Sequence, residues 1–180
     1  MSFFHNFRLF SFVKHLTVKS EKSLQQHYSD IVLKLNAVIE TATDGIISID
    51  ESGKIELVNP AAAQLFGYEI SELLGQKINI LMPRPDATHH DTYMLNYMQT
   101  GKRKIIGIGR EVLGKRKDGS VFPMRLSISE VKLHDRRIFT GIVHDLTEQK
   151  NIERKLKEEK ERTQRYLNVA NTVFVVIDKD

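Results

Sequence analysis

The chain has 180 residues, 41% of them hydrophobic, and a formal net charge of +4 at pH 7. That length accommodates one domain of ordinary size with flanking helices. Because acidic and basic residues are interspersed, the charge does not predict nucleic-acid binding. The chain has no cysteine, which excludes thiolate metal sites, iron–sulfur clusters, covalent c-type haem attachment and flavin–cysteine photochemistry. It also fits a reducing, cytoplasmic setting.

Residues 1–20 form a phenylalanine-rich segment that also carries Arg8, Lys14 and two histidines. The run is too short and too charged to span a bilayer, and no small-residue cleavage site marks a signal peptide. Contact with a membrane surface is one interpretation. Packing against protein is favoured, because the apolar residues fall on more than one helical face.

Residues 21–44 predict an amphipathic helix that ends at Asp44-Gly45. Its apolar side chains alternate at intervals of four and three residues, the a/d spacing of a coiled coil. Fewer than three heptads are present, so the pattern equally describes a helix that covers a sheet of its own domain. The residues with this spacing are Leu24, Tyr28, Ile31, Leu35, Val38 and Ala42.

Residues 45–148 predict an α+β domain with a single antiparallel five-stranded sheet and short helices on one face. A hairpin at 46–50 and 54–58 comes first, and a three-stranded meander follows between Gly101 and Leu146. Asn59-Pro60 opens the first short helix, and Asp118-Gly119 marks a hairpin turn.

The most informative stretch runs from Met82 to Arg110. A helix is predicted from an N-cap at Thr88 to a stop at Gly101, and four of its side chains share one face. A histidine on such a face is usually a core residue bonded to a backbone carbonyl, yet imidazole is also the usual axial ligand of haem iron. Both interpretations stay open on the residues alone. The shared face consists of His90, Tyr93, Met94 and Tyr97.

A glycine-spaced strand is predicted after this helix, ending at Arg110. Ile108 and Arg110 share one parity, whereas Gly107 and Gly109 leave the other face bare. An arginine among isoleucines needs an anionic or polar partner, because burying an unpaired charge is costly. The strand after the Asp118-Gly119 turn alternates strictly, with Phe122, Met124, Leu126 and Ile128 on one face.

The order of hairpin, short helices and meander resembles a PAS domain, and Asp145-Leu146-Thr147-Glu148 resembles the motif that closes such domains. The segment NILMPRPDATHHDTYMLNYM, followed by IIGIGREVLGKRKDGSVFPMRLSISE and FTGIVHDLTE, is similar to the haem-binding PAS domain of FixL-type oxygen-sensing histidine kinases. The similarity covers about residues 43–148.

This resemblance implies that the domain binds haem b and a diatomic gas, and oxygen is the gas expected. His90 corresponds to the proximal iron ligand and is therefore the expected metal site, whereas His89 has no counterpart role. Arg110 matches the arginine that holds a haem propionate and turns toward bound oxygen. The residues that match the apolar distal wall are Ile105, Leu126 and Ile128.

Tyr93, Met94 and Ile108 are expected to complete the cofactor site. Asn96 and Lys104 stand where the family places an arginine and a histidine near the propionates. Lys104 could still pair with a carboxylate, whereas Asn96 offers only neutral hydrogen bonds. No catalytic residue is expected.

Residues 149–167 are charge-dense and predict a helix, either a solvated linker or a signalling helix paired in a homodimer. LNVANTVFVVIDKD at 167–180 parallels IETATDGIISIDES at 39–52, which predicts that 168–180 begin a second PAS domain with its first strand. The chain is accordingly expected to be a sensory region, with a histidine kinase or cyclase output beyond residue 180.

Three functions follow from these patterns. The first is a haem-based gas sensor, in which ligand binding changes the partner of Arg110 and shifts the flanking helices. The second is a cofactor-free PAS module for dimerisation and signal relay. The third is a PAS sensor of a flavin or a small organic ligand.

Overall fold

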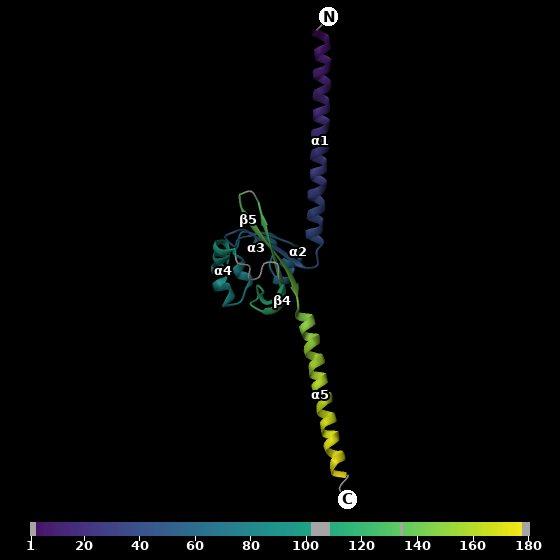
Figure 1. Ribbon diagram of the computed structural model, residues 1–180, viewed down its shortest axis with the longest axis vertical. Helices are drawn as coiled ribbons and strands as arrows, with labels where there is room; N and C mark the ends of the chain where they lie inside the picture. Colours follow the sequence, from purple (N-terminus) through teal and green to yellow (C-terminus); the bar gives the residue numbers. More distant parts are fainter. Residues whose placement is uncertain (1–2, 102–108, 134, 178–180) are drawn as a thin grey trace. The chain divides into compact units, whose positions relative to one another are not determined.

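The computed structural model describes residues 3–101, 109–133 and 135–177, with side chains described from Lys22 to Asn168 within those ranges. The chain divides into two compact units, Met1–Ala42 and Thr43–Asp180, and each is described by itself. Figure 1 labels helices α1 to α5 and strands β4 and β5.

The first unit consists of helix α1, Phe3–Thr41. It joins the segments 1–20 and 21–44 into one element, because neither proline nor glycine occurs before Gly45 to interrupt it. The helix ends three residues before the predicted stop at Asp44, and the Thr41 hydroxyl donates to the Ala37 carbonyl oxygen at 2.7 Å. No helix in the described part of the chain is both long and apolar enough to cross a membrane.

The second unit is built on a five-stranded antiparallel sheet in the order β2-β1-β5-β4-β3. The predicted hairpin and meander are confirmed, and pairing of β5 with β1 joins them into one sheet. The strands are β1 Gly45–Ile49, β2 Ile55–Val58, β3 Arg110–Lys115, β4 Val121–Lys132 and β5 Arg137–Asp145.

Short helices connect β2 to β3, and a long one follows β5. Asn59 caps the first of them: its Oδ1 accepts the Ala62 amide at 2.9 Å and the Ile46 amide at 2.8 Å, so the cap also ties the helix to β1. Gly67 ends that helix with a φ of 74°. The helices are α2 Pro60–Phe66, α3 Ile70–Leu73, the 3₁₀ helix η1 Ile78–Leu81, α4 Asp86–Thr100 and α5 Thr147–Ile177.

The core lies between one face of the sheet and the short helices. Alternate strand residues point toward it, and their partners in adjacent strands point the same way. The predicted alternation in β4 is confirmed, since Phe122 and Met124 are buried and Leu126 and Ile128 pack against the core from the same face. We call this face of the sheet the inner face.

Two predicted boundaries in the central segment were wrong. Helix α4 begins at Asp86, and Thr88 lies inside its first turn, where its amide donates to the Pro85 carbonyl oxygen at 3.0 Å. β3 begins at Arg110 instead of ending there, because its ladder with β4 runs from Arg110 opposite Leu126 to Lys115. The predicted site residues Lys104, Ile105 and Ile108 lie outside the described residues.

Helix α5 continues to Ile177, across residues 168–177 where the internal repeat predicted a strand. A lone strand has no backbone partner, and the sheet in the described residues consists of β1–β5 alone. No glycine or proline between Thr147 and Ile177 interrupts the helix. The assignment of 168–180 to a second domain therefore remains a proposal.

Candidate functional site

Helix α4 presents its apolar side to the core. Met94, Tyr97 and Met98 pack against the core cluster, and His90 is partly buried on the same side. Tyr93 does not join them: it is 48% exposed, and its ring stacks near that of His89 at a centroid distance of 6.2 Å. His90, Met94 and Tyr97 therefore share one side of α4, as the sequence predicted, whereas Tyr93 does not lie on that side.

The two adjacent histidines differ in environment. The exposed His89 places Nδ1 at 2.9 Å from the Pro85 carbonyl oxygen. His90 has a buried Nδ1 with no hydrogen-bond partner in the described part of the protein. Burial lowers the pKa of the His90 imidazole; the neighbouring Asp91 opposes this shift, and Lys77 adds to it. The lowered pKa favours the neutral imidazole, the form that can coordinate a metal.

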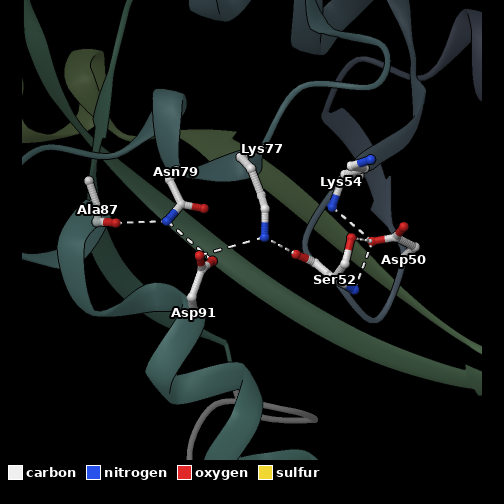
Figure 2. A network of polar contacts seen from close by, with 7 residues as sticks. All are labelled: Asp50, Ser52, Lys54, Lys77, Asn79, Ala87 and Asp91. Carbon is white, nitrogen blue, oxygen red and sulfur yellow. Dashed lines mark hydrogen bonds and ion pairs between the residues drawn. The ribbon is translucent and has the colours of Figure 1, made fainter.

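A polar network holds the turn of α4 that carries His90 (Figure 2). The Asn79 amide nitrogen donates to the Ala87 carbonyl oxygen at 2.7 Å and approaches Asp91 at 3.4 Å. The Lys77 ammonium lies 3.5 Å from Asp91 and donates to the Ser52 carbonyl oxygen. These contacts tie α4 to η1 and to the turn between β1 and β2.

The inner face of the sheet supplies the apolar wall. Leu126 and Ile128 are partly buried there, and Arg110 stands directly opposite Leu126 in the β3–β4 ladder. Directly opposite residues project from the same face of a sheet, so Arg110 belongs to the inner face, although its side chain is exposed at the start of β3.

A glycine allows close packing on the inner face. Gly141 pairs with both Ile47 and Ile128 at the centre of the sheet. A Cβ at this position would lie 3.3 Å from Leu126 Cδ1. The Leu126 side chain therefore lies close against the bare backbone of Gly141, and a larger residue there would force it to shift.

Glu130 is a member of this site that the sequence prediction missed. Its side chain is only 6% exposed; it accepts the Tyr97 hydroxyl at 2.7 Å and lies 3.3 Å from the Arg137 guanidinium. The β4 alternation of Phe122 to Ile128 continues to Glu130, so the strand pattern already placed a carboxylate on the inner face. The sequence does not show which side chains neutralise this carboxylate.

The edge of the site is connected to α5. Glu111, the residue after Arg110, lies 2.8 Å from the Lys150 ammonium in the first turns of α5. Asp145, at the end of β5, accepts the Thr147 amide at 2.8 Å and lies 3.2 Å from the Arg116 guanidinium. Two strands therefore contact the start of the same helix.

Residues 33–146 match the family model described as PAS fold. The chain is 43% identical over 143 residues to the sensor protein FixL of Bradyrhizobium diazoefficiens, covering 79% of this chain and 28% of that protein. It is 30% identical over 141 residues to the cell-division control histidine kinase PdhS of Brucella anthropi, covering 78% of this chain and 13% of the relative. The chain thus spans less than a third of either relative.

Among solved structures, the PAS domain of an HTR-like protein from Haloarcula marismortui matches with a TM-score of 0.57 and 25% sequence identity. The match covers 69% of this chain and 98% of that domain. The similarity to FixL inferred from the motifs and the expected five-stranded fold are both confirmed.

Proposed function

This chain belongs to the PAS family, and we propose that its inner sheet face and helix α4 form a haem-binding gas sensor, with oxygen as the gas. The observation that carries the proposal is the partly buried imidazole of His90 on the core side of α4, whose buried Nδ1 has no partner among the described residues. An imidazole of this kind is the usual axial donor to haem iron. The 43% identity to a sensor protein FixL supports the same assignment.

The residues present fit the group. Leu126 and Ile128 offer apolar surface, and Arg110 offers a cation at the rim; Gly141 lets Leu126 lie close to the backbone of the sheet. Haem held in this way would supply an iron that binds a diatomic gas reversibly. No cluster of three or more histidine, aspartate or glutamate side chains suited to a bare metal ion occurs in the described ranges, whereas an axial ligand requires one imidazole.

Each residue of the proposed site has its own role. His90 offers a neutral ring nitrogen, and the apolar wall excludes water from it. Tyr93 is proposed as a rim contact because it is exposed, and Met94 as part of the wall behind His90. Lys104, Ile105 and Ile108 remain proposed contacts from the segment between α4 and β3.

The signal is proposed to leave the site through β3. Arg110 is the rim cation, and the next residue, Glu111, is paired with Lys150 of α5. If Arg110 changed its partner, the neighbouring Glu111 would shift, and its contact with Lys150 of α5 would change. A histidine kinase or cyclase domain following α5 is the proposed receiver; the kinase named among the relatives supports the first.

The decisive experiment is an absorption titration of the purified protein with hemin. We expect a Soret band that saturates at one haem per chain and shifts when oxygen is added to the ferrous protein. His90→Ala should lose the band, whereas His89→Ala, the matched control, should keep it. Equal binding by both variants, or no spectral change with oxygen, contradicts the proposal.

A cofactor-free dimerisation and relay module is the second candidate. It is favoured by the exposed apolar side chains along α1, including Leu24, Ile31 and Leu35. The two functions are separable, because a cofactor-free module predicts that the unmodified protein dimerises but gives no Soret band with hemin. If the band forms and His90→Ala loses it but still dimerises, the relay role exists alongside haem binding. Visible flavin bands in the purified protein would instead indicate the third class of ligand.

A further inference from the structure

Two buried polar atoms have no hydrogen-bond partner in the described part of the chain: Asn79 Oδ1 and His90 Nδ1. They are chemically complementary, because an amide oxygen only accepts and a neutral imidazole carries one N–H donor. Leaving either atom buried and unpaired is unfavourable, because the atom has lost its hydrogen bonds to water and gained none in return. Two such atoms that could satisfy one another therefore suggest a pair.

The fold brings both side chains to the same turn of α4. The Asn79 amide nitrogen bonds to the Ala87 carbonyl oxygen at 2.7 Å, three residues before His90. A long helical side chain generally lies over the turn N-terminal to its own Cα, so we expect the His90 ring over the turn that contains Ala87. In Figure 2 the Asn79 nitrogen makes the contacts to Ala87 and Asp91, and its oxygen makes none.

Three other acceptors near this turn are engaged. The Pro85 carbonyl oxygen contacts His89 Nδ1 at 2.9 Å and accepts the Thr88 amide at 3.0 Å. The Ala87 carbonyl oxygen accepts from Asn79, and Asp91 is paired with Lys77 at 3.5 Å. Among these groups, Asn79 Oδ1 is the buried acceptor that still has capacity.

We propose that Asn79 is the positioning residue of His90: its Oδ1 accepts the Nδ1–H of the ring and so leaves Nε2 as the nitrogen free to bind iron. The two atoms are not bonded in the structure, so the pairing requires a side-chain rotation. This inference deepens the proposed haem site and rests on it. Metal-binding histidines generally donate their second ring nitrogen to such an acceptor, which fixes the tautomer and the ring orientation.

The test begins with the haem-free protein and measures the tautomer of His90. Nitrogen-15 NMR of the ring, recorded at about pH 8 where histidine is neutral, distinguishes a proton on Nδ1 from one on Nε2. We expect the proton on Nδ1 in the unmodified protein. Asn79→Ala should move it toward Nε2, the form that free histidine prefers, and Asn79→Asp, which keeps an acceptor, should leave it on Nδ1.

Lys77→Met is the matched control for loosening of the helix. It removes the contacts of Lys77 with Asp91 and Ser52 but leaves the Asn79 amide in place, so the tautomer should not change. A proton on Nε2 in the unmodified protein overturns the inference without any variant. So does an unchanged tautomer in Asn79→Ala, or the same change in Lys77→Met.

Hemin dissociation supplies the second readout. Loss of an outer partner of a metal-binding histidine typically weakens binding about 10- to 100-fold, so hemin should leave Asn79→Ala faster by that factor and leave Asn79→Asp at nearly the original rate. If the tautomer responds as expected but the protein binds no hemin, the pairing of Asn79 with His90 stands and the proposed function fails. If hemin binds through His90 but Asn79→Ala leaves the tautomer unchanged, this inference alone fails.

Discussion

Glu130 shows how a single side chain can anchor helix α4. Its carboxylate is almost fully buried on the inner face of the sheet and is approached by Tyr97 from α4 and Arg137 from β5. Tyr97 also packs its ring edge-on to Phe139 at a centroid distance of 5.9 Å. Because a buried carboxylate depends on its donors, the position of Tyr97 is set by the sheet as much as by α4.

Removing the Tyr97 hydroxyl should therefore destabilise the protein. Tyr97→Phe keeps the ring and deletes one hydrogen bond to a buried carboxylate, which is worth about 2 kcal/mol of unfolding free energy. Urea denaturation of the haem-free protein measures it. Tyr93→Phe, on the exposed side of the same helix, should change the value by less than about 0.5 kcal/mol. Equal losses in the two variants would show that Glu130 is satisfied without Tyr97.

Among the elements, the junction of β5 with α5 depends on one aspartate. Burial by itself would raise the pKa of Asp145, but hydrogen bonds from Thr147 and the Arg116 guanidinium outweigh it and lower the pKa below the ordinary value of 3.8. A carboxyl whose pKa is lower in the folded state stabilises the fold above its unfolded pKa. That stabilisation is lost as the pH falls through the folded pKa.

Asp145→Asn should consequently be less stable than the unmodified protein at neutral pH, and the difference should shrink once the pH falls below 3.8. The asparagine still offers an acceptor to Thr147, so the variant isolates the charge that Arg116 contacts. Unfolding free energies of both proteins, measured at neutral pH and below pH 3.8, give the effect. Asp30→Asn is the control, since that carboxylate forms no ion pair within the described side chains. A difference that grows in acid would contradict the assignment.

The contact of α5 with β3 is expected to be weak and therefore reversible. Lys150 and Glu111 are both substantially exposed, and exposed ion pairs contribute about 0–1 kcal/mol. Lys150→Met should leave the global unfolding free energy within about 1 kcal/mol but raise amide hydrogen exchange in the first turns of α5.

Lys155→Met is the matched control, because Lys155 lies further along α5 and forms no ion pair with a described residue. Its amide exchange should match that of the unmodified protein. If both lysine variants exchange alike, β3 does not restrain α5, and the proposed route from Arg110 to the output helix loses its first contact.

At the scale of the whole molecule, α1 and α5 carry apolar side chains that the described residues leave exposed, among them Leu35 at 58% and Leu156 at 70%. Exposed apolar residues at heptad spacing are typical of helices that pair with a second copy. We therefore expect a homodimer in which these helices take part, in agreement with the sensory role proposed above.

The heptad itself provides the test. Leu35→Lys places a charge on the predicted seam and should shift the protein from dimer to monomer in sedimentation equilibrium. Leu33→Lys, at an exposed position off the seam (63% exposed), should leave the dimer intact. Hemin binding by the Leu35→Lys variant then shows whether a monomer suffices for the site. Dissociation by both variants, or by neither, would exclude this seam as the interface.

The sequence by itself determined the features that act over a few residues. Asn59-Pro60, Gly101 and the Asp118-Gly119 turn each stand where predicted, because caps and turns satisfy their own backbone groups locally. Side-chain alternation predicted β4, turn residues predicted the hairpin and the meander, and the motifs identified the family. Thr88 failed as a cap because the preceding turn was already helical, a competition that spacing does not reveal.

Only the tertiary structure decided which side chains meet. Pairing of β5 with β1 put both ends of the domain in one sheet, and the β3–β4 register placed Arg110 beside Leu126. The tertiary structure also buried His90 more than His89, left Tyr93 exposed, and placed Tyr97 and Arg137 around Glu130. Burial and charge neutralisation depend on residues far apart in the chain, so no local pattern could supply them.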